Sequence, residues 1–220
     1  MSEENEMDYA RIGALLAPFG IEPTEAQLAQ IQAYIRLLLH WNLSLNLTSV
    51  RDPEGIVQRH FGESMFLTKV LPVENCRLAD IGSGAGFPGM AIKLICPTIR
   101  LTLIESNQKR RAFLAEVVRG LNFEGVEIVA KRFEDLRTQG WSLDVLTARA
   151  IGEIPKVLKW AKNSVASAGH IALWLGGQDA IKVSRTAGWD WGQPIQIPES
   201  QQRFILIGAP SEGKPERSSA

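Results

Sequence analysis

Residues 80–89 read DIGSGAGFPG, the end of an apolar run that passes into a turn with glycines at positions 82, 84 and 86. A glycine-rich turn directly after a strand lets the backbone approach a ligand closely, because glycine has no side chain to stand in the way. In sheets of alternating strands and helices, ligands bind at such turns. The fold and the function therefore depend on which ligand this spacing fits.

The spacing of the three glycines separates the possible nucleotide ligands. A dinucleotide fingerprint needs G-x-G-x-x-G, and Phe87 stands where its third glycine should be. The chain contains no G-x-x-x-x-G-K-[ST], which excludes a P-loop. An acid followed by G-x-G-x-G is instead typical of the first motif of class I S-adenosylmethionine (SAM) methyltransferases. This motif makes Asp80, Gly82, Gly84 and Gly86 candidate cofactor-binding residues.

Glu105 supports a ligand that contains ribose. It stands at the end of LTLIES (101–106), the second predicted strand, where a carboxylate can accept hydrogen bonds from both ribose hydroxyls. The same residue would serve NAD, so it indicates a ribose without choosing the cofactor.

The rhythm of the chain from residue 77 onward predicts an α/β fold. Strands are expected at 77–82, 101–106, 126–130, 143–148 and 170–175, and helices at 87–96, 107–120 and 153–167. Gly120 is the expected C-terminal cap of the second of these helices. A further helix at 178–187 and strands at 193–197 and 203–208 complete the pattern. Such alternation indicates a Rossmann-like, mostly parallel sheet with helices on both faces.

The first part of the chain is predicted to be helical. Residues 24–40 carry apolar side chains at helical spacing after Thr24, a candidate N-cap, and Asp52-Pro53 begins a second helix near 53–70. We therefore expect an N-terminal helical extension over residues 1–72 and a SAM-binding methyltransferase domain over 73–209. The polar, proline- and glycine-containing residues 210–220 are expected to be disordered.

Composition points to a cytoplasmic globular protein. Its 220 residues are 45% hydrophobic and 22% charged, with no apolar run of membrane-spanning length, and the acidic start does not resemble a signal peptide. Cys76 and Cys96 are too few for a disulfide framework, and the three histidines match no metal-binding spacing, so no metal is expected.

The formal charge is zero, with 24 basic and 24 acidic side chains. A nucleic-acid surface would therefore have to be a local patch, such as Lys109-Arg110-Arg111 or Lys131-Arg132, because phosphate contacts carry most of the affinity. A solvated helix face is the alternative interpretation of such a cluster.

An ordered set of short motifs carries a resemblance to a known family. These are NLT at 46–48, RH at 59–60, DIGSGAGFPG at 80–89, ES-x-x-K-R at 105–110, R-x-E at 132–134 and RA at 149–150. Over roughly residues 24–180 the chain resembles the RsmG/GidB family, bacterial methyltransferases that modify guanine N7 in a decoding-region loop of 16S rRNA.

The resemblance implies further site residues. Gly82, Phe87, Phe133, Glu134 and Arg149 are implied as SAM-contacting. Arg59, His60, Lys109, Arg110 and Arg111 are the candidates for RNA contact. Two positions depart from the family: Leu175 stands where a lysine is usual, and Glu63 where an aspartate is usual.

The chemistry agrees with methylation of a purine ring nitrogen. Methylation of pyrimidine C5 needs a cysteine nucleophile, and neither cysteine follows a late strand. Residues 147–155, TARAIGEIP, lack the Asp/Asn-Pro-Pro-aromatic motif of exocyclic-amine methyltransferases. Guanine N7 has a free lone pair, so positioning suffices and no catalytic acid–base residue is expected.

Other functions stay open at this point. They are a SAM-dependent small-molecule methyltransferase, a dinucleotide-dependent oxidoreductase, which Phe87 disfavours, and a non-catalytic RNA- or SAM-binding module. Naked 16S rRNA, the 30S ribosomal particle and an assembly intermediate are all compatible substrates, and the motifs do not specify an oligomeric state.

Overall fold

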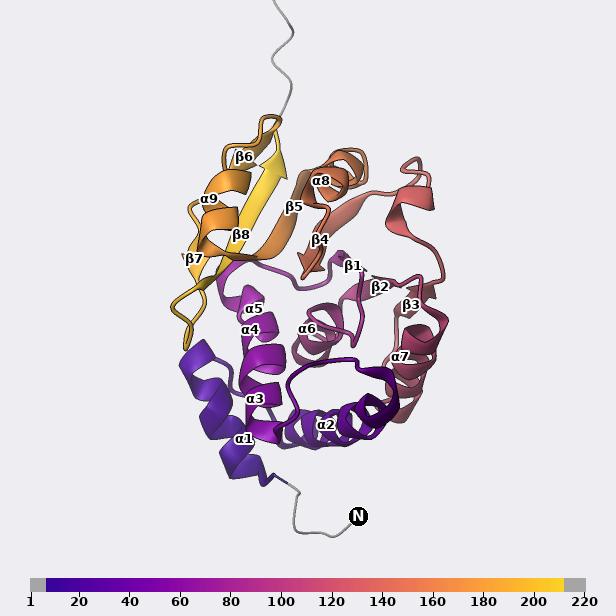
Figure 1. Ribbon diagram of the computed structural model, residues 1–220, viewed down its shortest axis with the longest axis vertical. Helices are drawn as coiled ribbons and strands as arrows, with labels where there is room; N and C mark the ends of the chain where they lie inside the picture. Colours follow the sequence, from indigo (N-terminus) through magenta and orange to yellow (C-terminus); the bar gives the residue numbers. More distant parts are fainter. Residues whose placement is uncertain (1–6, 212–220) are drawn as a thin grey trace, which may run out of the picture.

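One twisted sheet organises the computed structural model, which describes residues 7–211 (Figure 1). Its strand order is β3-β2-β1-β4-β5-β8-β6, and β7 pairs with β8. The strands are β1 (Arg77–Ile81), β2 (Arg100–Ile104), β3 (Val126–Val129), β4 (Leu143–Arg149), β5 (Val165–Gly176), β6 (Trp189–Trp191), β7 (Ile195–Gln196) and β8 (Arg203–Pro210). The first five strands are parallel and β8 is antiparallel to its neighbours, which confirms the mostly parallel sheet.

The order of the strands creates a ligand-binding crevice. The chain moves outward from β1 to β2 and β3, then returns to the other side of β1 with β4. Loops on the two sides of β1 therefore diverge at the carboxyl ends of the strands, and ligands of doubly wound sheets bind there. The glycine turn follows β1 at this point.

Helices cover both faces of the sheet. Alternate residues of β1 enter different cores: Leu78 joins the core under α6 (Gly89–Ile95) and α7 (Gln108–Gly120), and Ala79 joins the core under α8 (Ile154–Lys162). The second core also contains Val183 of α9 (Gly177–Val183). This alternation follows from the period of two in a strand, and it confirms the predicted layers.

The N-terminal helices gather below the sheet (Figure 1). They are α1 (Tyr9–Leu16), a 3-10 turn (Ala17–Phe19), α2 (Glu25–Leu45) and a helical stretch made of α3 (Pro53–Ile56), the π-helical turn η3 (Val57–Gly62), α4 (Glu63–Met65) and α5 (Leu67–Val70). The predicted caps are confirmed, because Thr24 forms a capping box with Gln27 and the Asp52 side chain accepts from the Gly55 N–H.

These helices share one core with the sheet. Ile12 and Tyr34 belong to the same buried cluster as Leu78 and Leu101 of the sheet. The predicted boundary at residue 72 falls in the loop between α5 and β1.

Several predicted boundaries are wrong. Gly120 is the last residue of α7 and not its cap, since Leu121 caps the helix and Asn122 takes the left-handed conformation (φ 53°). Helix α6 begins at Gly89, with Pro88 as its N-cap. Helix α8 ends at Lys162 and not at 167, because the chain enters β5 at Val165. A register shift between Leu143 and Val145 accommodates this early start of β5.

Two elements are not predicted by the patterns above. Helix α1 is capped by the Asp8 side chain and buries Ile12, Leu15 and Leu16, which have helical spacing. Strand β6 is only three residues long and pairs with β8. Of the tail expected to be disordered, Pro210 ends β8, and residues 212–220 lie outside the described residues.

Among the described helices, none combines the length and the apolar character needed to cross a bilayer.

Candidate cofactor site and nucleic-acid interface

A cavity of about 310 Å³ opens at the carboxyl ends of β1, β2, β3 and β4. Its walls are the glycine turn (Ile81, Gly82), the end of β2 (Ile104, Glu105, Ser106), residues 131–134 and 151–153, and Arg110 of α7. Four predicted cofactor residues line it: Gly82, Glu105, Phe133 and Glu134. The loops after four strands thus build one site at the predicted edge of the sheet.

Glu105 is the central polar residue of this cavity. Only 4% of it is exposed, and both carboxylate oxygens accept backbone hydrogen bonds, Oε2 from the Gly84 N–H (3.0 Å) and Oε1 from the Asn107 N–H (2.7 Å). Each oxygen has a second lone pair, so the carboxylate can accept further hydrogen bonds from a ligand. Glu105 therefore joins the glycine turn to the start of α7 and faces the cavity.

The glycine turn needs its glycines for different reasons. Gly82, Gly84 and Gly86 have φ values of 67°, 54° and 85°, in the left-handed region that disfavours side chains. Beside Gly82 an added Cβ would meet only Ile151, a residue of the cavity wall, at 3.3 Å. At Gly86 an added Cβ would collide with the hydroxyl of Tyr34. Gly82 thus leaves room at the cavity, and Gly86 leaves room for an N-terminal helix.

Tyr34 of α2 holds the turn from below. Its ring is fully buried, and its hydroxyl donates a hydrogen bond to the Ala85 carbonyl at 2.7 Å. Burial raises the pKa of Tyr34 well above its ordinary value, so the hydroxyl stays protonated as a donor. The sequence carried no signal for this contact, because Tyr34 reads as one more apolar position of a helix.

Phe87 faces the N-terminal helices and not the cavity. Its ring stacks on Tyr34 (centroids 5.4 Å apart) and on His60 (4.9 Å). The Nε2 atom of His60 lies 2.6 Å from Thr48 Oγ1. Burial, with the positive charges of Arg149 and Arg59, lowers the pKa of His60 to about 3, so the ring is neutral. Both residues serve packing here, and their assignment to SAM and RNA stays a prediction.

Asp80 is a buried connector behind the turn. It is fully buried, its Oδ1 accepts from the Thr147 hydroxyl (2.8 Å), and its Oδ2 accepts from the Gly89 N–H (3.2 Å). Burial raises the pKa of Asp80 to about 7. The carboxylate thereby ties β1 to β4 and to the start of α6, and it does not line the cavity.

Arg149 ends β4 in an ion-pair cluster with two residues that the sequence did not assign. Its Nη2 lies 3.0 Å from Glu63 Oε2, and Arg203 Nε lies 2.7 Å from Glu63 Oε1. Arg149 also donates to the Arg59 carbonyl at 2.8 Å. Its guanidinium is directed to η3 and α4 and does not line the cavity, although residues 151–153, which follow it, do.

The three basic residues at the start of α7 differ from one another. Arg110 reaches the cavity, with Nη1 3.9 Å from Glu105 Oε2. Arg111 turns back and donates from Nη1 to the carbonyls of Glu105 and Ser106. Lys109 is exposed, as is Arg59 on η3. The solvated-face interpretation therefore does not apply to Arg111, whose guanidinium fixes the loop before the helix.

The structure brings together only part of the predicted set. The predicted cofactor and RNA residues outside the cavity wall are Asp80, Gly84, Gly86, Phe87, Arg149, Arg59, His60, Lys109 and Arg111. Across residues 7–211, no three His, Cys, Asp or Glu side chains are grouped as metal ligands would be.

Comparisons with known proteins place this geometry in context. The family GidB, rRNA small subunit methyltransferase G, matches residues 27–187. Ribosomal RNA small subunit methyltransferase G of Photobacterium profundum is 31% identical over 200 residues, covering 90% of this chain and 96% of that protein. The protein of the same name from Xylella fastidiosa (strain 9a5c) is 35% identical over 191 residues, covering 85% and 89%.

A solved structure shares the fold. A SAM-dependent methyltransferase from Aquifex aeolicus superposes with a TM-score of 0.62 at 16% identity, over 76% of this chain and 97% of that one. The fold is thus the class I methyltransferase fold. The family match spans the glycine turn, Glu105, residues 131–134 and Arg149, and so covers every wall of the cavity. The chain belongs to the GidB family, rRNA small subunit methyltransferase G.

Proposed function

We propose that this chain transfers the methyl group of SAM to N7 of a guanine in a decoding-region loop of 16S rRNA, in the cytoplasm. The observation that carries the proposal is the buried carboxylate of Glu105, which lies at the end of β2 in one cavity with the glycine turn. Membership of the rRNA small subunit methyltransferase G family supports the substrate class.

The residues of the cavity fit SAM. The free lone pairs of Glu105 suit the two ribose hydroxyls, and Gly82 leaves its backbone open to the methionine part. Phe133 and Glu134 would border the adenine. Gly84, Gly86 and Phe87 belong to the turn itself, Asp80 holds it through the Gly89 N–H, and Arg149 would position residues 151–153. The chain would thus consist of a helical extension (1–72) that supports a SAM-binding part (73–209).

The proposed reaction requires the protein mainly to position the SAM methyl group against guanine N7. When bound, SAM supplies a methyl group on a sulfonium, and guanine N7 offers a lone pair that carries no proton. The residues of the cavity then need only orient the two reactants and exclude water. Neither cysteine can serve as a nucleophile at this site, because Cys76 precedes β1 and Cys96 follows α6, at the opposite edge of the sheet. Burial also raises the pKa of Cys76 to about 11.

RNA would approach from the side of the cavity where Lys109 and Arg110 begin α7, with Arg59 and His60 on η3 as further candidates. Either naked 16S rRNA or the 30S particle would present the loop. Within residues 7–211, the exposed Lys109 side chain takes part in no ion pair, which agrees with a role at an interface.

The decisive test is mass mapping of methylguanosine. 16S rRNA and 30S particles from cells without this activity are incubated with the protein and SAM, then digested and sequenced by mass. We expect one N7-methylguanosine in the decoding-region loop. A methyl group at another base or atom would refute the proposal, as would RNA left unmodified by a protein that binds SAM. Calorimetric titration with SAM and with NAD separates this function from that of a dinucleotide-dependent oxidoreductase.

A further inference from the structure

A second and larger cavity, about 520 Å³, borders the 310 Å³ cavity beside the glycine turn, which is called the cofactor cavity below. The two share Phe133 and Glu134 of the short helix η4 (Phe133–Asp135). The second cavity lies between η4 with the loop after it and helix α8, and Trp160, which is 6% exposed, forms part of its floor. We call it the η4–α8 groove. The cofactor cavity accounts for none of its other residues.

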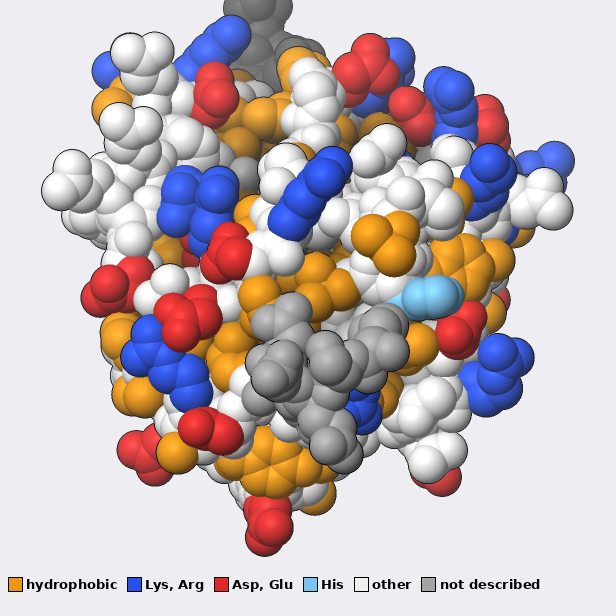
Figure 2. All heavy atoms as spheres, turned by 60° about the horizontal axis from the view of Figure 1, so that its bottom comes forward, with side chains coloured by type: hydrophobic (Ala, Val, Ile, Leu, Met, Phe, Trp, Pro, Cys, Tyr) orange, Lys and Arg blue, Asp and Glu red, His pale blue; other side chains and the backbone are white. Residues whose placement is uncertain are grey.

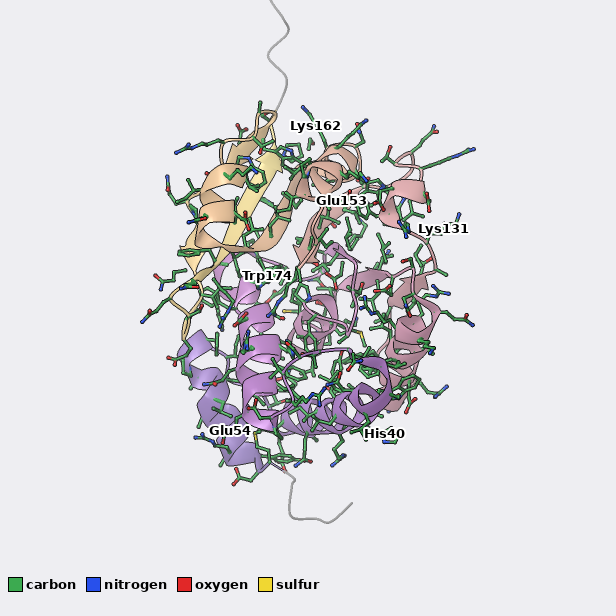
Figure 3. The ribbon with its side chains drawn as sticks, in the orientation of Figure 1. His40, Glu54, Lys131, Glu153, Lys162 and Trp174 are labelled. Atoms are coloured by element: carbon green, nitrogen blue, oxygen red, sulfur yellow. The ribbon has the colours of Figure 1, made fainter. Side chains whose placement is uncertain are left out.

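The walls of the groove are basic on both sides. Arg137 and Thr138 contribute one wall, and Lys156, Lys159 and Asn163 of α8 contribute the other. Lys162, the last residue of α8, is also exposed but lies outside the groove, with its Nζ beside Gly188 in the loop before β6. Figure 3 shows Lys131 on the loop before η4, where it lines the cofactor cavity, and Lys162 at the outer end of α8.

The basic charge is in excess and largely unpaired. The residues that line the groove carry three basic side chains, Arg137, Lys156 and Lys159, and one acidic side chain, Glu134, in a chain whose formal charge is zero. In the described part of the chain, Lys156 pairs with Glu153 (2.7 Å), and no ion pair involves Arg137, Lys159 or Lys162. By contrast, Figure 2 shows acidic, basic and hydrophobic side chains interspersed on the face formed by the N-terminal helices.

We propose that the η4–α8 groove binds phosphates of the RNA strand that carries the target nucleotide. The proposal rests on the function proposed above. A strand whose base reaches the cofactor cavity must continue beyond it, and the groove is contiguous with that cavity through η4. Unpaired lysines and arginines attract a polyanion and gain affinity by releasing its counterions. Since Phe133 and Trp160 are buried in the floor, the groove would bind the backbone of the strand and not stack its bases.

The test compares two variants with the same change of charge. Arg137→Glu with Lys159→Glu alters the groove at exposed residues outside the cofactor cavity. The control, Arg100→Glu with Arg119→Glu, alters exposed arginines at the start of β2 and the end of α7, at the opposite edge of the sheet. Binding of a labelled 16S rRNA fragment with the decoding-region loop is measured by anisotropy at several salt concentrations, and SAM binding by calorimetry.

We expect the groove variant to bind the RNA at least tenfold more weakly than the control variant. Its slope of log affinity against log salt should fall by roughly 0.7 for each lost phosphate contact. SAM affinity should match the wild type in both variants, which shows that each is folded. Equal RNA affinity in the two variants would show that the groove does not bind the RNA. So would a loss of binding to 30S particles alone, because that result points to a ribosomal protein as the partner.

Failure of the proposed function gives a different result. If the wild-type protein neither binds nor methylates the RNA, the proposed function is wrong, and the proposal that the groove binds RNA fails with it. If the wild type methylates the RNA and the groove variant does so with unchanged KM for RNA, only the groove is wrong.

Discussion

Glu105 fixes the glycine turn and is the proposed partner of the cofactor's ribose. Replacing it with alanine removes the acceptor of the Gly84 and Asn107 N–H groups as well as the proposed partner of the ribose. A hydrogen bond to a charged group contributes about 1.5–3 kcal/mol, so SAM affinity should fall roughly tenfold to a hundredfold in Glu105→Ala. Glu105→Gln keeps one oxygen acceptor and should lose less.

Calorimetry with SAM measures this effect, and thermal unfolding reports on the fold. Glu127→Gln, which changes an exposed carboxylate on β3, is the matched control and should leave the affinity unchanged. Wild-type SAM affinity in a folded Glu105→Ala protein would move the ribose elsewhere.

Tyr34 acts on the same turn without touching the cavity. In Tyr34→Phe the Ala85 carbonyl loses its buried donor, which should lower the free energy of unfolding by about 1–3 kcal/mol. The loosened turn should also raise the KM for SAM several-fold, while kcat at saturating SAM stays near the wild-type value. Steady-state kinetics check this split. Tyr9→Phe on α1 is the control, and an unchanged KM in Tyr34→Phe would leave Tyr34 with a purely structural role.

His60 predicts a pH dependence of stability. Its pKa is about 3 in the folded protein and 6.5 ordinarily, so the unfolded chain binds the proton more readily. The free energy of unfolding that depends on a neutral His60 ring is therefore fully present above pH 6.5 and is lost as the pH falls towards 3. Between about pH 6.5 and 4.5 the loss should be roughly 2–3 kcal/mol. Urea unfolding of the wild type and of His60→Gln at several pH values measures this loss. If the free energy of unfolding falls equally with pH in both proteins, His60 is not the group responsible.

At the scale of elements, three adjacent basic residues at the start of α7 have different surroundings, and we expect them to have different roles. Arg111 donates to the carbonyls of Glu105 and Ser106, so Arg111→Ala should lower the stability by about 1 kcal/mol and leave the salt dependence of RNA binding unchanged. Arg110→Ala and Lys109→Ala should instead weaken RNA binding. Each should flatten the salt slope by roughly 0.7–0.9 per lost contact. Anisotropy titrations check these slopes. If none of the three changes the slope, α7 is not part of the RNA surface.

The elements that the sequence predicts well are those with strong local signals. The caps at Thr24 and Asp52 and the first four strands have such signals, since side-chain chemistry and apolar runs mark them directly. The predicted start of β5 was wrong because VASAG (165–169) has no apolar run, and pairing with β4 decides its conformation. Strand β6 has no such signal and forms by antiparallel pairing with the edge of β8.

At the scale of the whole molecule, the residues of the site likewise fall into those that the sequence could predict and those that only the fold brings together. Gly82 and Glu105 were predictable, because motifs after successive parallel strands meet at one edge of the sheet, and Phe133 and Glu134 were implied by the family resemblance. Tyr34, Glu63 and Arg203 were not, because their partners lie 51 to 140 residues away in the chain. Only the packing of the N-terminal helices and of β8 against the sheet brings them to the turn and to Arg149.

The shared core predicts that the helical extension and the sheet unfold together. Leu38 of α2 is fully buried in the cluster that also contains Leu78 and Leu101 of the sheet. Leu38→Ala should therefore lower the free energy of unfolding by about 2–5 kcal/mol. Far-ultraviolet circular dichroism and tryptophan fluorescence should show one coincident transition, because loss of the core exposes both parts at once. Leu43→Ala, at a side chain 86% exposed on the same helix, should change stability by less than about 0.5 kcal/mol. Two separate transitions in denaturant, with Leu38→Ala shifting only the first, would instead show that residues 1–72 fold as a unit of their own.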